Sequence, residues 1–257
     1  MNLPVKANQT AVQSQETIFL SIVIPAYNET GRIATTLQKI MDYARGQKWL
    51  TEIIVVDDGS QDGTADLARS QLAGWTWSKV ISLKKNRGKG AAVKEGALEA
   101  RGELILLTDA DLSTPIEELE KFWPLVARHY DLVIGSRALP ASEIRKRQSC
   151  LRETMGKSFN RLVRWLVLPD FKDTQCGFKL FKKEAAREIF ARIKTSGFAF
   201  DVEVLLLARQ LGYKVAEVPI IWINSPDSRV KLLSSSVKML FELLHLRLRK
   251  NRKKLTP

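Results

Sequence analysis

Two aspartates separated by one residue follow a run of apolar residues near the middle of the chain. The run ELILL is followed by TDADL, which contains Asp109 and Asp111. A carboxylate at the end of a buried strand is costly unless a cation lies against it. Two carboxylates at this spacing can share one divalent ion. Mg²⁺ or Mn²⁺ suits such ligands and often bridges them to substrate phosphates. The motif therefore predicts a metal site for a phosphorylated ligand.

A plainer interpretation makes the two acids the N-cap of a helix that begins near Pro115. Ser113 and Thr114 can perform that capping themselves. The two aspartates are then surplus to the cap, which favours the metal site.

A second acidic pair, Asp57 and Asp58, follows an earlier apolar run in EIIVVDDGS. The nucleotide-binding signatures GxGxxG and GxxxxGK[ST] are absent from the sequence. The segment RGKGAAV at 87–93 is glycine-rich and basic, but it fits a helix N-terminus equally well. The two acidic pairs are therefore the strongest indication of a functional site in this half of the chain.

The apolar pattern of the first half predicts alternating strands and helices. The strands are expected at 19–25, 52–60, 79–85 and 103–111, and the helices at 28–45, 62–73 and 88–102. Such alternation indicates an α/β fold: a mostly parallel sheet of the Rossmann-like type, with helices on both faces. These sheets bind ligands beyond the carboxyl ends of their strands. Both acidic pairs lie at such ends, so we expect them to share one site.

The second half is less regular. It predicts a helix at 115–129, a strand at 130–137, a loop at 138–150, an amphipathic segment at 151–168, a strand with a turn at Gly177 within 172–183, a helix at 200–212, a strand at 213–223 and an amphipathic basic helix at 237–254. We divide the chain into a flexible leader (1–17), a catalytic domain (18–232) and a basic tail helix (233–257).

Composition narrows the class of protein. The chain has 257 residues with 45% hydrophobic and 27% charged residues, as in soluble globular proteins. Its net charge of +13 favours anionic partners such as nucleic acid, anionic lipid or phosphorylated substrates. Two cysteines without a CxxC motif argue against a zinc site or a disulfide framework. No run of 18 apolar residues and no signal-peptide core occurs, so we expect no transmembrane helix.

Five motifs occur in one order along the chain: SIVIPAYNE, EIIVVDDGSQDGT, NRGKGAAVKEG, LTDADLSTP and VIGSR. In this set and order the chain resembles the inverting family 2 glycosyltransferases with the GT-A fold, from about residue 20 to 232. RETMGKSFNRLVR, DTQCGFKLF and PDSRVKL are similar to the motifs of polyprenyl-phosphate hexosyltransferases within that family. The resemblance implies transfer of a hexose, foremost glucose from UDP-glucose, to a dolichyl or undecaprenyl monophosphate, with inversion to a β-linked product.

The resemblance also implies roles for individual residues. Asp109 and Asp111 would hold Mg²⁺ or Mn²⁺ on the diphosphate, and Arg137 and Arg152 would face the phosphates of donor or acceptor. The residues implied in nucleotide-sugar binding are Pro25, Tyr27, Glu29, Asp57, Asp58, Lys89, Ala110, Arg229 and Lys231.

A phosphate acceptor fits the lack of an obvious catalytic base. A lipid phosphate is already ionised at neutral pH, and both histidines lie outside the motifs. Transfer to a saccharide or protein hydroxyl would instead want a carboxylate base, for which Asp173, Asp201 and Glu203 are the candidates. Mannosyl transfer from GDP-mannose to the same lipid stays an alternative.

The pattern of basic residues is the basis for predicting where in the cell the protein acts. Between 145 and 168, and again in the tail, they alternate with Trp and Leu, which suits the surface of an anionic membrane, although a core-packed helix with a solvated face has the same pattern. We expect peripheral attachment to the cytoplasmic face of a membrane. A nucleic-acid partner is not expected, because the acids gather at the sheet edge, where they would repel a phosphate backbone.

Overall fold

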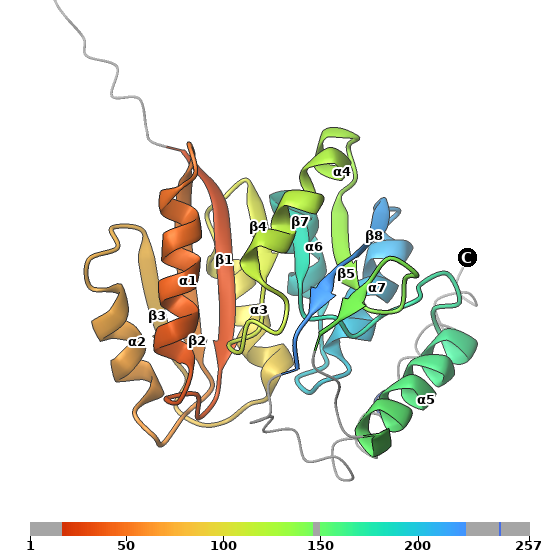
Figure 1. Cartoon of the computed structure of the whole chain (residues 1–257), viewed down its shortest axis with the longest axis horizontal. Coiled ribbons are helices and arrows are strands. Elements are labelled where there is room, and N and C mark those ends of the chain that lie inside the picture. Colours follow the sequence, from red (N-terminus) through yellow and green to blue (C-terminus); the bar gives the residue numbers. More distant parts are fainter. Residues whose placement is uncertain (1–16, 146–149, 225–241, 243–257) are drawn as a thin grey trace, which may run out of the picture.

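The computed structural model describes residues 17–145, 150–224 and 242. These residues form a seven-stranded sheet in the order β3-β2-β1-β4-β7-β5-β8 and a small two-stranded sheet of β6 and β9. Helices cover both faces of the large sheet (Figure 1). The predicted α/β architecture is thereby confirmed. The predicted leader and tail helix lie outside the described residues, apart from Thr17 and Glu242.

The first half alternates strands and helices as the apolar pattern predicts. Its elements are β1 (Ile18–Ala26), α1 (Ile33–Arg45), β2 (Leu50–Asp57), α2 (Thr64–Leu72), β3 (Ser78–Ser82), α3 (Lys89–Glu99) and β4 (Leu104–Leu107). All four strands pair in parallel. Asp57 at the end of β2 therefore lies beside Ala26 of β1 and Ser82 of β3, at the edge where β4 also ends.

Side chains of the parallel strands alternate between two hydrophobic cores, as period-two geometry requires. Val23 and Val56 face the core that contains α3, α6 and α7. Ile22 and Ile24 face the opposite core, which contains α1. Strands that are buried on both faces explain the continuous runs of Ile, Val and Leu in the sequence.

The second half contains η1 (Ile116–Lys121), α4 (Trp123–Ala127), β5 (Leu132–Ser136), β6 (Glu143–Ile144), α5 (Cys150–Leu166), β7 (Lys179–Lys182), α6 (Lys183–Arg192), α7 (Phe200–Gln210), β8 (Val215–Pro219) and β9 (Ile221–Trp222). The helical structure expected at 115–129 is present, but it is divided into a 3₁₀ helix and a short α-helix. Pro124 has no backbone N–H to continue a single helix. The sequence reading also missed α6 and placed β6 within a loop.

Strand β7 runs antiparallel to both β4 and β5. Its first residue, Lys179, therefore pairs with Leu107, the last residue of β4. The turn that precedes β7 is brought to the same edge as the ends of the parallel strands. The antiparallel insertion thus adds a second source of side chains to the predicted site.

Helix α5 lies apart from the main sheet, at the lower right of Figure 1. Val163 near its end is buried, whereas Arg161 and Arg164 are exposed and Trp165 is 79% exposed. Within the described part of the chain, no helix has both the length and the apolar character needed to cross a bilayer.

Candidate active site

Asp109 and Asp111 lie in a tight turn directly after β4. The Leu112 backbone N–H donates to the carbonyl oxygen of Asp109 at 3.0 Å, and the Ser113 N–H donates to the Asp111 carboxylate at 2.9 Å. Leu112 adopts a φ of 44°, a left-handed conformation that bulky residues rarely take. Strain of this kind persists only where surrounding contacts hold it, and it recurs at functional sites.

The amino end of α3 supplies a cation to this turn. Lys89 is its first residue, and its Nζ lies 2.6 Å from Oδ1 of Asp109. Burial alone would raise the pKa of Asp109, but the charge and hydrogen bond of Lys89 outweigh it and lower that pKa. Asp109 is therefore a carboxylate that is already paired.

Asp111 has the opposite electrostatic balance. Burial, and then the neighbouring charge of Asp109, raise its pKa. Arg32 compensates weakly, with its guanidinium 3.9 Å from the carboxylate. Asp111 therefore gains more from an added cation than Asp109 does.

The turn before β7 packs directly on Asp109. A Cβ built on Gly177 would lie 2.7 Å from both Cγ and Oδ1 of the Asp109 carboxylate, so a side chain there would have to displace that carboxylate. Lys179 is fully buried and holds this turn by donating to the carbonyl oxygen of Cys176. Its Nζ also donates to Asp201 at 2.5 Å. Burial, and then Asp173, raise the pKa of the Cys176 thiol to about 11, which makes it a poor nucleophile.

Arg137, at the end of β5, is bound to a buried carboxylate. Its backbone N–H, Nε and Nη2 donate to Asp173 at 2.9, 2.7 and 2.9 Å. Burial would raise the pKa of Asp173, but Arg137 lowers it to about 2. The guanidinium also lies 5.7 Å from the centre of the Trp222 ring. Asp173 thus fixes the orientation of Arg137.

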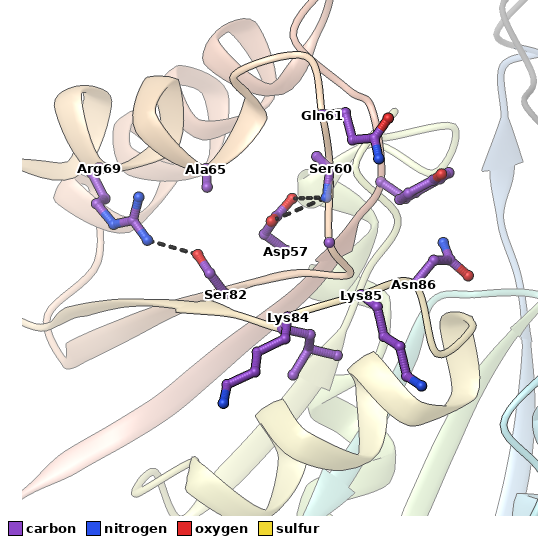
Figure 2. A pocket seen from close by; sticks show the side chains of 12 residues that line it. Asp57, Ser60, Gln61, Ala65, Arg69, Ser82, Lys84, Lys85 and Asn86 are labelled. Atoms are coloured by element: carbon purple, nitrogen blue, oxygen red, sulfur yellow. Dashed lines mark hydrogen bonds between the residues drawn. The ribbon is translucent and has the colours of Figure 1, made fainter.

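A cavity of about 470 Å³ opens at the same edge, beyond β2 and β3 (Figure 2). Tyr27 lines it and is 39% exposed, and Asp57 lines it while accepting from the Ser60 N–H. Its cationic wall consists of Arg69, Lys84 and Lys85. An acid between cations suits a polar, anionic ligand.

Asp58 lies beside Asp57 but has a different environment. Its carboxylate is buried and accepts from the backbone N–H groups of Arg87 and Gly88 at 2.7 and 2.8 Å. It therefore holds the loop that leads to Lys89. Asp58 is not among the residues that line the cavity.

The other residues predicted to bind the donor or acceptor lie in several different elements. Pro25 lies within β1, Glu29 pairs with Arg32, and the carbonyl oxygen of Ala110 accepts from the Thr36 hydroxyl at 2.7 Å. Arg152 belongs to α5, but its side chain lies outside the described part, as do Arg229 and Lys231.

Sequence reasoning missed Gly177, Lys179 and Arg32 as parts of the site. A lysine between apolar residues in GFKLF was the available signal for Lys179, because a charge on a buried strand needs a partner. Arg32 carried no comparable signal.

Comparison with curated proteins identifies relatives along most of the chain. A protein of Dictyostelium discoideum called dolichyl-phosphate beta-glucosyltransferase is 37% identical over 246 residues, which cover 91% of this chain and 75% of that protein. The proteins of the same name from Saccharomyces cerevisiae and Homo sapiens are each 36% identical, over 92% and 90% of this chain and 76% and 75% of their own lengths.

Solved structures share the fold at lower identity. Glucosyl-3-phosphoglycerate synthase from Mycobacterium tuberculosis matches with a TM-score of 0.68 and 19% identity, over 89% of this chain and 79% of that one. Another crystal structure of that enzyme contains Mn²⁺, UDP-glucose and glycerol 3-phosphate. At this identity the likeness shows the fold.

The family model described as "Glycosyl transferase family 2" matches residues 21–190, the segment that contains both acidic pairs, Lys89 and Arg137. This match and the identities above agree with the motifs at the sheet edge. The chain belongs to glycosyl transferase family 2.

Proposed function

We propose that this protein transfers glucose from UDP-glucose to dolichyl phosphate with inversion, giving a β-linked dolichyl-phosphate glucose. The observation that carries the proposal is the 36–37% identity, over about nine-tenths of the chain, to proteins named for this reaction. The catalytic domain would span residues 18–232.

In this proposal Asp109 and Asp111 hold a divalent cation, Mg²⁺ or Mn²⁺, on the diphosphate of the donor. Their donor set fits such an ion, because hard cations prefer carboxylate oxygens and often complete their shell with substrate phosphates and water. Burial and the charge of Asp109 raise the pKa of Asp111, so a nearby cation would stabilise its ionised form. When bound, the ion would neutralise charge that develops on the leaving diphosphate.

The nucleoside of the donor would occupy the 470 Å³ cavity. Tyr27 offers an exposed ring for stacking on the base, and Asp57 offers a carboxylate for hydrogen bonds to base or ribose. Pro25, Glu29, Lys89 and Ala110 would support the donor from the same edge. Asp58 would act through the Lys89 loop that it holds.

Arg137 and Arg152 would receive the phosphate of the acceptor, with Arg229 and Lys231 closing over the diphosphate. Arg137 is held rigidly by Asp173, and a fixed guanidinium binds phosphate with little loss of entropy. The phosphate oxygen would then attack the anomeric carbon from the face opposite the diphosphate. The bond to the diphosphate breaks as the new bond forms.

The carboxylates considered as general bases favour this acceptor over a hydroxyl. Asp173 is paired with Arg137 and its pKa is lowered to about 2, which makes it a weak base. Burial raises the pKa of Asp201, but its carboxylate is bound by Lys179. Glu203 accepts from the backbone N–H groups of Lys194 and Thr195. A phosphate acceptor is already ionised and needs no general base. The reaction can therefore proceed although these three carboxylates are paired with other groups.

We also propose peripheral attachment to the cytoplasmic face of a membrane. The acceptor is a lipid, and α5 presents exposed Arg161 and Arg164 next to the exposed Trp165. Cations with an interfacial tryptophan suit an anionic lipid surface.

The direct test incubates the purified chain with UDP-glucose, dolichyl phosphate and Mg²⁺ or Mn²⁺, and measures glucose extracted with the lipid. GDP-mannose, undecaprenyl phosphate and a saccharide acceptor are tested in parallel. We expect transfer from UDP-glucose to lipid phosphate. Transfer only to the saccharide, or no transfer with any lipid phosphate, would refute the proposal.

A further inference from the structure

The Lys89 ammonium lies directly against Asp109, one of the two carboxylates proposed to hold the metal ion. Its Nζ lies 2.6 Å from Oδ1 of Asp109, and the two side chains are 24% and 36% exposed. The two groups therefore form an ion pair.

Lys89 also has a second anion within its electrostatic reach. Asp201, at the start of α7, is buried and directly follows Phe200 in the chain. Lys179 donates to Oδ1 of Asp201, and the Phe200 ring centre lies 5.9 Å from the Lys89 Nζ. The Lys89 ammonium therefore lies in a site with negative charge on more than one side.

We propose that Lys89 is an exchangeable counter-ion of the metal site: it neutralises Asp109 in the metal-free protein and must leave that carboxylate when the cation binds. This inference rests on the proposed function, in which Asp109 and Asp111 hold the metal. An ammonium and a divalent cation repel each other and compete for the same carboxylate. The donor's diphosphate is the partner to which the displaced ammonium turns.

The exchange couples metal binding to donor binding. Without a nucleotide, the metal must break the pair of Lys89 and Asp109, so its affinity is low. The oxygens of a diphosphate can bind both the metal ion and the Lys89 ammonium. This binding offsets the loss of the ion pair between Lys89 and Asp109. Metal and donor therefore strengthen each other's binding, since such coupling is reciprocal.

The test measures the binding of Mn²⁺ alone to the full chain, by electron paramagnetic resonance of the free ion and without nucleotide. Lys89→Met removes the competing charge, so we expect Mn²⁺ to bind about tenfold more tightly. The gain in Mn²⁺ affinity on adding UDP should be smaller than in the wild type. Lys89→Gln gives the same test if the Met variant folds poorly, as judged by circular dichroism.

Two further variants separate charge from packing. Lys89→Arg keeps a cation beside Asp109, so Mn²⁺ should bind about as weakly as in the wild type. Lys79→Met removes an equal charge from an exposed pair with Glu99, and should change the affinity less than about twofold. Unchanged or weaker Mn²⁺ binding in Lys89→Met and Lys89→Gln overturns the proposal, and so does equal tightening in Lys89→Arg.

A last variant distinguishes this proposal from the function on which it rests. Asp109→Ala should abolish specific Mn²⁺ binding. Wild-type Mn²⁺ binding in that variant would refute the metal site itself. Loss of binding in Asp109→Ala, without tightening in Lys89→Met, would refute only the exchange of Lys89.

Discussion

At the scale of single residues, the two aspartates of TDADL differ in their electrostatic state. Asp109 is neutralised by Lys89, whereas Asp111 is held by the Ser113 N–H and is destabilised by the charge beside it. A metal between them would give Asp111 a closer cation than Arg32, which lies 3.9 Å away, and would replace the partner of Asp109. The pair is thus arranged to respond to a cation.

Replacement of either aspartate tests this arrangement. Asp109→Asn or Asp111→Asn should reduce turnover by at least about a hundredfold, because a bound metal supplies several kcal/mol of charge stabilisation in the transition state. Asp66→Asn, on the exposed face of α2, serves as the control and should leave the rate unchanged. The assay follows glucose transfer to the lipid. A near-normal rate in either site variant would refute its role as a metal ligand.

The pair of Arg137 and Asp173 predicts a dependence of stability on pH. The pKa of Asp173 is lowered to about 2 in the folded protein, so its contribution to the free energy of unfolding is present above pH 4 and is lost as pH falls towards 2. We expect Asp173→Asn to cost about 2 kcal/mol at neutral pH, because it leaves the partly buried Arg137 guanidinium without its counter-charge.

Urea denaturation of both proteins between pH 6 and pH 3 measures this effect. The difference between wild type and Asp173→Asn should begin to shrink below pH 4. A difference that is constant across the range would show that the charge of Asp173 does not stabilise the fold.

At the scale of elements, helix α3 connects the sheet to the site. Gly96 lets it lie close to the strands: a methyl group there would meet Val23, and would lie 2.9 Å from Cγ2 of Val56. The same helix begins at Lys89, directly after the loop that Asp58 holds. A shift of α3 away from the sheet would therefore move the cation on Asp109.

Alanine at Gly96 should destabilise the protein by about 1–3 kcal/mol through overpacking, and should also reduce activity. Gly156→Ala in α5 is the matched control, since a methyl group at that exposed position meets nothing within 4 Å. It should stabilise the protein by up to about 1 kcal/mol through helix propensity. Thermal denaturation compares the two. Equal effects of the two changes would contradict the close packing of α3.

The parallel half of the fold could be predicted because its signals are local. Each of its strands is a continuous apolar run, and each helix has apolar positions at helical spacing, as in Ile33, Leu37 and Ile40 of α1. Parallel pairing then places all strand ends at one edge, which brought Asp57 and Asp109 together in the prediction.

The rest of the site depends on contacts between distant parts of the chain. The antiparallel pairing of β7 with β4 brings Gly177 to Asp109, and nothing in either segment specifies that pairing. Asp57 and Asp58 look equivalent in the sequence, yet one lines the cavity and the other holds a loop 29 residues away. Helix α6 was missed although Ala185, Ala186, Ile189 and Phe190 have helical spacing.

At the scale of the whole molecule, the net charge of +13 contrasts with the acidic pairs at the sheet edge. A basic surface favours approach to anionic lipid, whereas the local acids favour a cation and its diphosphate. Arg161 and Arg164 are exposed on α5, and Asn160 of the same helix donates to the carbonyl oxygen of Lys172, next to Asp173. The helix is thus connected to the loop that orients Arg137.

We expect the double variant Arg161→Glu/Arg164→Glu to bind vesicles that contain an anionic lipid at least about thirtyfold more weakly than the wild type, since each lost cation costs about 1 kcal/mol. Lys39→Glu/Lys48→Glu reverses two exposed charges near α1 and serves as the control. Vesicle sedimentation at low and high salt measures both. Equal losses in the two variants would mean that net charge, and not α5, governs attachment.

In the proposed reaction, glucose is transferred to a lipid phosphate in a single inverting step. The most direct measurement is the anomeric configuration of the extracted lipid product by nuclear magnetic resonance, after incubation with UDP-glucose, whose glucosyl bond is α. We predict a β-linked glucosyl phosphate that is absent when Asp109→Asn replaces the wild type. An α-linked product, or glucose attached to a hydroxyl group, would contradict the account.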